Sequence, residues 1–94
     1  MMSNEEMTLL DSILIRKVEE TQKANNRTDQ QLGEQAFGWM KSPKMKLQSI
    51  KGYGERKQQQ LRLADFINLC EALGLSWQKE CADALKEIKS IQKK

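Results

Sequence analysis

The chain has 94 residues, the size of one small domain, and a formal net charge of +3. Hydrophobic residues make up 38% of it and aromatic residues 5%, so Leu, Ile and Met must fill most of a modest core. A single proline and the lack of alternating Val-, Ile- and Thr-rich runs favour an all-helical fold. The start is acidic and no apolar run could cross a bilayer, so we expect no secretory signal, no membrane contact and a cytoplasmic location.

Residues for catalysis and metal binding are scarce. The sequence has no histidine, which is the commonest general base and metal ligand. Its two cysteines, Cys70 and Cys81, fall on apolar helix faces, where we expect reduced core thiols rather than a disulfide or a metal site. A nucleophile motif, a phosphate-binding glycine loop and a paired-carboxylate spacing are also missing. We therefore expect no enzyme activity, no cofactor or metal, and no small-molecule ligand.

The positive charge is concentrated in one part of the chain. Residues 28–60 carry six cations against three anions, whereas the segments before and after are close to neutral. Only Glu55 opposes the cations in the second half of this block, which are Lys41, Lys44, Lys46, Lys51, Arg56 and Lys57. This concentration predicts a surface for a polyanion, and a solvated surface with incidental lysines is the alternative.

Two capped helices are predicted before the basic segment. The first runs from about Asn4 or Glu5 to Lys23, with Ser3 as its N-cap. It is apolar over more than one stripe, so we expect it to contact both the core and a partner. The second helix begins at Thr28, which forms a capping-box pattern with Gln31.

The second helix contains a glycine that needs an explanation. Leu32 and Ala36 point inward, and Gly33 between them costs about 1 kcal/mol relative to Ala. Close approach of the next helix would explain this glycine, and a weak helix is the alternative. Gly38 is expected to end the helix, and a Trp39 packed on a partner is one interpretation of the turn. The other interpretation is a sealed corner, filled by Phe37, Trp39 and Met40.

A short basic helix is predicted at about residues 43–51. Ser42 and Pro43 favour a helix start, and Gly52 favours a helix end. Leu47 and Ile50 lie three residues apart and are expected to face the core, which fixes the rotation of the helix. The side chains then left on its outer side are Lys44, Lys46, Gln48, Ser49 and Lys51.

Two further helices are predicted after a polar loop from Tyr53 to Gln60. The fourth spans residues 61–73 and ends at Gly74, and its apolar face is formed by Leu63, Phe66, Ile67, Cys70 and Leu73. The fifth spans residues 77–91, with Ser76 as its cap, and its apolar stripe extends farther than one small core can use. We therefore expect a homodimer built on this helix, the first helix or both. The residues assigned to the dimer interface are Leu85, Ile88 and Ile91.

The segment from Thr28 to Trp77, about half the chain, resembles the phage-repressor (Cro/XRE) helix-turn-helix family. The matching residues are Thr28, Leu32 and Gly33 in the second helix, Leu47, Ile50 and Gly52 in the third, and Ala72-Leu73-Gly74-Leu75-Ser76 at the end of the fourth. The resemblance implies an all-α, five-helix, lambda-repressor-like helix-turn-helix domain with long first and last helices. It also implies a dimeric, sequence-specific transcriptional regulator of bacterial or phage type that binds double-stranded DNA, such as a repressor.

The sequence departs from this family at two places. Trp39-Met40-Lys41 enlarges the turn before the third helix. Asp29 stands where the family often has a phosphate-binding Gln, and a carboxylate repels phosphate, so Gln30 is assigned that contact instead. The other phosphate contacts are assigned to Lys41, Ser42, Lys51, Tyr53, Arg56 and Lys57. The base contacts are assigned to Lys44, Met45, Lys46, Gln48 and Ser49.

Met45 and Tyr53 each keep a second interpretation, because Met45 also suits a half-buried packing role and Tyr53 also suits the edge of the core.

A different class of function remains as well. The over-long apolar faces of the first and fifth helices suit a small helical protein–protein interaction module, an adaptor of phage or plasmid type. Salt-sensitive binding to duplex DNA would separate the two classes.

Overall fold

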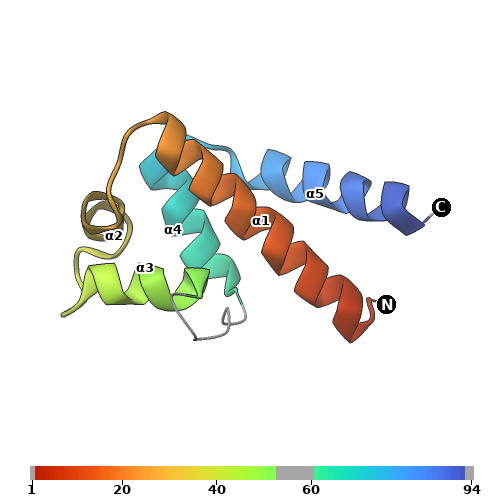
Figure 1. Cartoon of the computed structure of the whole chain (residues 1–94), viewed down its shortest axis with the longest axis horizontal. Coiled ribbons are helices and arrows are strands. Elements are labelled where there is room, and N and C mark those ends of the chain that lie inside the picture. Colours follow the sequence, from red (N-terminus) through yellow and green to blue (C-terminus); the bar gives the residue numbers. More distant parts are fainter. Residues whose placement is uncertain (1, 53–60, 93–94) are drawn as a thin grey trace.

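The structure, a computed structural model, describes residues 2–52 and 61–92. Over these residues it is built from helices, without a strand: α1 (Asn4–Ala24), α2 (Asp29–Phe37), α3 (Pro43–Lys51), α4 (Leu63–Leu73) and α5 (Trp77–Gln92) (Figure 1). The all-helical prediction is therefore confirmed, and the loop predicted from Tyr53 to Gln60 lies outside the described residues. None of the described helices combines the length and apolar character that crossing a membrane requires.

The first two helices start at the predicted caps. The Ser3 hydroxyl accepts a hydrogen bond from the Glu6 backbone N–H, and the Glu6 carboxylate accepts one from the Ser3 N–H, each at 3.2 Å. Thr28 and Gln31 make the same reciprocal pair at the start of α2, at 3.1 and 2.9 Å. Each pair satisfies two backbone donors that a helix end leaves open. Local sequence is therefore sufficient to place both helix starts.

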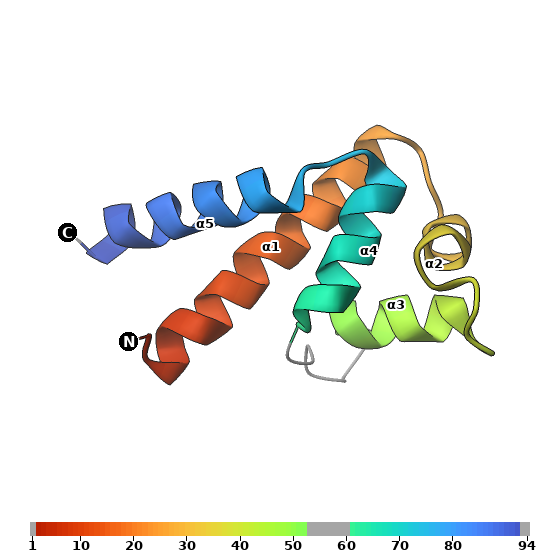
Figure 2. The ribbon, with the colours of Figure 1, turned by 180° about the vertical axis from the view of Figure 1, so that it is seen from behind.

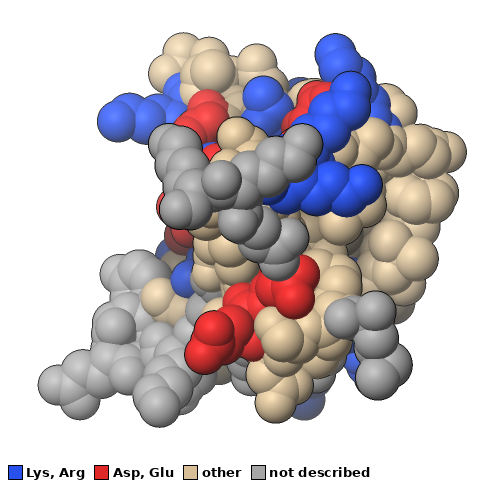
Figure 3. Space-filling view, turned by 90° about the vertical axis from the view of Figure 1, so that its right-hand side faces the viewer, with Lys and Arg blue, Asp and Glu red and all other residues tan. Residues whose placement is uncertain are grey.

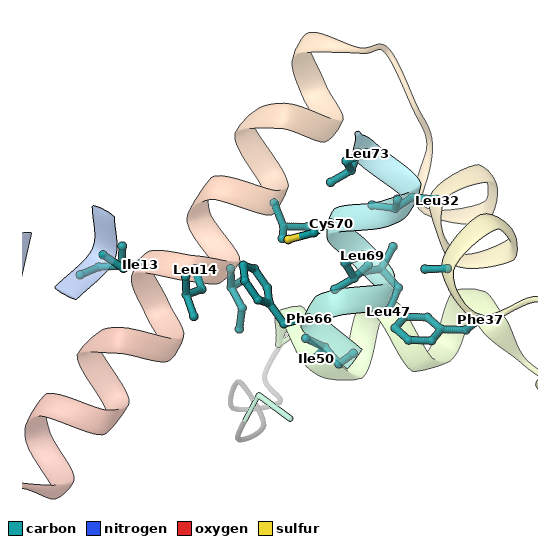
Figure 4. Close-up of a cluster of buried hydrophobic side chains, with 14 of the residues drawn as sticks. Ile13, Leu14, Leu32, Phe37, Leu47, Ile50, Phe66, Leu69, Cys70 and Leu73 are labelled. Carbon is teal, nitrogen blue, oxygen red and sulfur yellow. The ribbon is translucent and has the colours of Figure 1, made fainter. Parts of the chain in front are cut away.

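Helix α4 is the centre of the core, with α1 and α5 on one side and α2 with α3 on the other (Figure 2). Its fully buried side chains are Phe66, Leu69 and Cys70. Figure 4 places them between Leu14 of α1 and Leu32 of α2. Because α4 is covered from two sides, its buried stripe includes Leu69, which the predicted face did not contain.

The predicted face of α4 was wrong at its first residue. Leu63, the first residue of α4, is exposed, whereas Leu61 before it packs against the core and Phe66 after it is fully buried. Both cysteines are free thiols, as predicted, with Cys70 buried and Cys81 half-buried. Burial, together with the nearby Glu80 and Cys81, raises the pKa of Cys70 to about 12.

Helices α1 and α5 lie side by side near α4 and diverge toward the two chain ends (Figure 1). Ala84 and Ile88 of α5 are buried where the two helices are close, and Arg16 of α1 bridges to Glu87 at 2.9 Å. Three apolar side chains of these two helices stay exposed, and these are Met7, Leu85 and Ile91.

Candidate nucleic-acid interface

The start of α3 lies directly on α2 at Gly33. A Cβ atom at Gly33 would lie 2.9 Å from the carbonyl oxygen of Pro43 and 3.0 Å from the backbone nitrogen of Lys44. Backbone atoms cannot move aside as a flexible side chain can, so this position has room for glycine alone. The predicted close approach is confirmed, and it joins α2 and α3 backbone to backbone.

The rotation of α3 is set by the two predicted apolar residues. Leu47 and Ile50 are both buried, and Gly52 ends the helix with a left-handed φ of 74°. Ser42 is the N-cap residue, but its side chain makes no capping hydrogen bond, so that part of the prediction was wrong. Its backbone ψ is 73°, compared with 167° at Ser3, and this turns the hydroxyl away from the first turn.

The outer side of α3 is most open at its N-terminal end. Lys41, Ser42, Lys44 and Met45 are exposed there, and we call this group the α3 tip. Met45 has 59% of its surface exposed, so its packing role is not supported. Within residues 2–52 and 61–92 the side chains of Lys41 and Lys44 make no hydrogen bond or ion pair. The tip therefore offers two uncompensated cations beside an exposed apolar side chain.

The other two lysines of α3 are paired within the chain. Lys46 Nζ lies 3.0 Å from the Asp65 carboxylate of α4. Lys51 Nζ donates to Asp29 at 2.8 Å and to Gln22 at 3.0 Å. Lys46 had been assigned to a base and Lys51 to a phosphate, but carboxylates of the neighbouring helices already neutralise both. The basic face of α3 is therefore smaller than the sequence suggested.

Asp29 is the centre of a polar cluster that joins three helices. It accepts hydrogen bonds from Gln22 of α1 at 2.8 Å and from Gln48 of α3 at 3.4 Å, in addition to the one from Lys51. Gln22 is only 7% exposed, so the cluster reaches into the protein. Burial alone would raise the pKa of Asp29, but the bonds from Gln22, Lys51 and Gln48 and the Lys51 charge outweigh it and hold that pKa below its usual value.

The assigned residues outside α3 divide into two groups. The Gln30 amide donates to the Glu34 carboxylate one turn on, so a negative group stands beside the assigned phosphate contact. Tyr53, Arg56 and Lys57 lie outside the described residues, and their assignments stay predictions. Within α3 itself, the assigned Ser49 is half-buried.

The enlarged turn exposes two of the three side chains expected to seal it. Phe37 is fully buried and fills the corner alone, whereas Trp39 is 71% exposed and Met40 is also exposed. The Trp39 ring contacts the Phe37 ring edge-on, with ring centroids 5.9 Å apart. The sealed-corner interpretation was therefore wrong for Trp39 and Met40, because the chain leaves the core as soon as Phe37 has filled it.

The predicted dimer residues do not share one environment. Leu85 and Ile91 are exposed, but Ile88 is only 3% exposed because it packs inside the chain between α5 and α1. Ile88 is therefore removed from the assigned contact. Figure 3 shows that the end of the molecule bearing the two termini mixes basic and acidic side chains rather than presenting a uniformly basic face.

Comparisons of the chain with models of known protein families, with curated proteins and with solved structures found no match. Among the described residues, no group of three or more His, Cys, Asp or Glu side chains comes together in a way that could hold a metal ion. The features that bear on function are therefore the geometry of α2, of α3 and of the turn between them.

Proposed function

We propose that the protein is a cytoplasmic, sequence-specific transcriptional regulator that binds double-stranded DNA as a dimer through α3, with a lambda-repressor-like fold. The observation that carries this proposal is the contact of Gly33 with Pro43 and Lys44. It holds the start of α3 rigidly on α2, while Leu47 and Ile50 turn inward. A helix held in this way can enter the major groove with its N-terminal residues first.

The α3 tip supplies the chemistry that such docking needs. Lys44 can donate to guanine O6 and N7, and Met45 can contact the methyl group of thymine. Lys41 and Ser42 can hold phosphates, which position the protein without specifying sequence. Gln48 is bonded to Asp29, so the reading is assigned mainly to Lys44 and Met45.

A binding selection from random duplex DNA, read by sequencing, tests this proposal. A dimer should enrich a two-fold motif whose half-sites lie about one helical turn apart. The Lys41 phosphate contact of each tip should also make binding fall with salt, with a slope of log K against log salt near −1.8 for a dimer, since each phosphate contact contributes about −0.9. An absence of binding to any duplex at low salt would refute the proposal.

A protein-interaction module is the second candidate, and one observation favours it. Trp39, Met40 and Met45 are large apolar side chains exposed around the start of α3. Exposed tryptophan is enriched at the energetic centres of protein interfaces, and methionine adapts to varied partners. If the DNA selection fails, these three residues are the surface on which to look for a protein partner.

A further inference from the structure

Two lysines of α3 are held by carboxylates from the helices on either side of it. Asp29 is the first residue of α2 and holds Lys51, and Asp65 lies in the first turn of α4 and holds Lys46. The paired side chains keep only 14–23% of their surfaces exposed. Water therefore screens these pairs less than it screens an ion pair on an open surface.

The Lys51 contact is the more constrained of the two. Its Nζ has two acceptors, Asp29 and Gln22, so an outward movement to a phosphate would break both bonds. It would also leave the Asp29 carboxylate, half-buried in the cluster, without its cation. Lys51 can therefore contact DNA only if the bonds of the Asp29 cluster are broken.

We propose that Asp29 and Asp65 mask Lys51 and Lys46 from the DNA backbone. The inference rests on the proposed function. Phosphate contacts supply nearly all of the binding to random DNA, so two masked lysines lower that binding. The unmasked tip, with Lys44 and Met45, keeps the base contacts. The mask thus lowers the sequence-independent part of the affinity and leaves the base contacts of the tip as a larger share of the binding free energy.

The Asp29→Asn substitution tests the mask, because it removes the charge and nearly preserves the shape. The released Lys51 should add one phosphate contact per protomer and steepen the salt slope on random duplex DNA by about 0.9. When salt is lowered from about 200 to 50 mM, the affinity of the variant for random DNA should therefore rise by roughly 3.5-fold more, per protomer, than the affinity of wild type. The gain should be about equal on the selected site and on random duplex DNA, because a phosphate contact does not distinguish sequences.

Three controls separate unmasking from other effects. Asp29→Asn combined with Lys51→Gln should return the slope to that of wild type, because the released cation is gone. Glu19→Gln changes the net charge equally at an exposed position on α1, which holds no α3 lysine, and should leave the slope unchanged. Asp65→Asn should release Lys46 and steepen the slope independently of the Asp29 cluster.

The outcomes distinguish the mask from the proposed function. Wild-type binding with equal slopes for Asp29→Asn, Asp65→Asn and Glu19→Gln would overturn the mask and leave the DNA-binding proposal standing. Weaker binding by Asp29→Asn at every salt concentration, with an unchanged slope, would assign Asp29 a merely structural role and would also overturn the mask. Failure of the wild-type protein to bind any duplex would remove the proposed function and the mask together. Far-UV circular dichroism of each variant checks that it is folded.

Discussion

Gly33→Ala should destabilise the protein, although alanine is the better helix former. In an open helix the change would gain about 1 kcal/mol. Here the new Cβ would lie 2.9 Å from the Pro43 carbonyl oxygen and 3.0 Å from the Lys44 nitrogen, so α2 and α3 must separate. Overpacking of this kind costs about 1–3 kcal/mol. Subtracting the helix gain from the middle of that range leaves a net loss of about 1 kcal/mol.

Thermal unfolding followed by far-UV circular dichroism measures this difference. A loss of about 1 kcal/mol should lower the melting temperature of a domain of this size by roughly 4–8 °C. Ser12→Ala, at an exposed position within α1, is the matched control and should leave stability unchanged or raise it by a few tenths of a kcal/mol, roughly. A rise in melting temperature for Gly33→Ala would refute the close contact of the two helices. It would also refute the inference that α2 holds α3 rigidly.

Three other predictions follow from the tip, the α5 surface and the Asp29 cluster. Lys44→Ala should lose about 1–3 kcal/mol of binding free energy on the selected DNA site and make the protein less selective for the base pair that Lys44 contacts. Lys41→Ala should weaken binding to all duplexes alike and reduce the salt slope by about one per protomer. Leu85→Glu with Ile91→Glu should give a monomer in sedimentation, because charge is costly to bury at an apolar contact. Because the pKa of Asp29 is lowered in the folded protein, its ionised form stabilises the fold at pH values above the pKa of about 3.9 that Asp has in the unfolded chain. This stabilisation is lost as the pH falls through the lower pKa of the folded protein. Wild type should therefore lose more stability than Asp29→Asn between about pH 5 and 2.

Each of these has a contrary result. A Lys41→Ala variant that changes sequence preference while Lys44→Ala does not would move the reading function from the helix to the turn. Wild-type protein that sediments as a monomer at high micromolar concentration would remove the dimer, and parallel acid unfolding of wild type and Asp29→Asn would remove the stabilising role of the carboxylate. Ile88→Ala is the packing control for the sedimentation experiment, and it should cost about 2–5 kcal/mol of folding stability without dissociating a dimer.

The elements that the sequence predicted correctly are those that neighbouring residues determine. Ser3 and Thr28 begin their helices through bonds to residues three positions away, and Leu47 and Ile50 set the rotation of α3 by their spacing. Even the Gly33 contact could be anticipated, because an interior glycine is unfavourable unless something needs its space.

The parts that were missed depend on residues far apart in the chain. Asp29 and Lys51 are 22 positions apart, and only the packing of α2 against α3 brings them to 2.8 Å. Counting charges along the sequence therefore treated Lys51 as free. The sealed-corner interpretation of Trp39 failed for a different reason: the size of Trp39 favoured burial, but Phe37 fills the corner alone.

The contact between Gly33 and the start of α3 has a consequence for retargeting the protein. The two helices meet there through backbone atoms, and the exposed side chains of Lys44 and Met45 take no part in the Asp29 cluster that also joins α2 to α3. Lys44 and Met45 can then be exchanged for other residues without tilting the helix that carries them. The same scaffold could accept a library of tips, each presented to the groove in one orientation, and differences in the sequences they select would report side-chain chemistry alone.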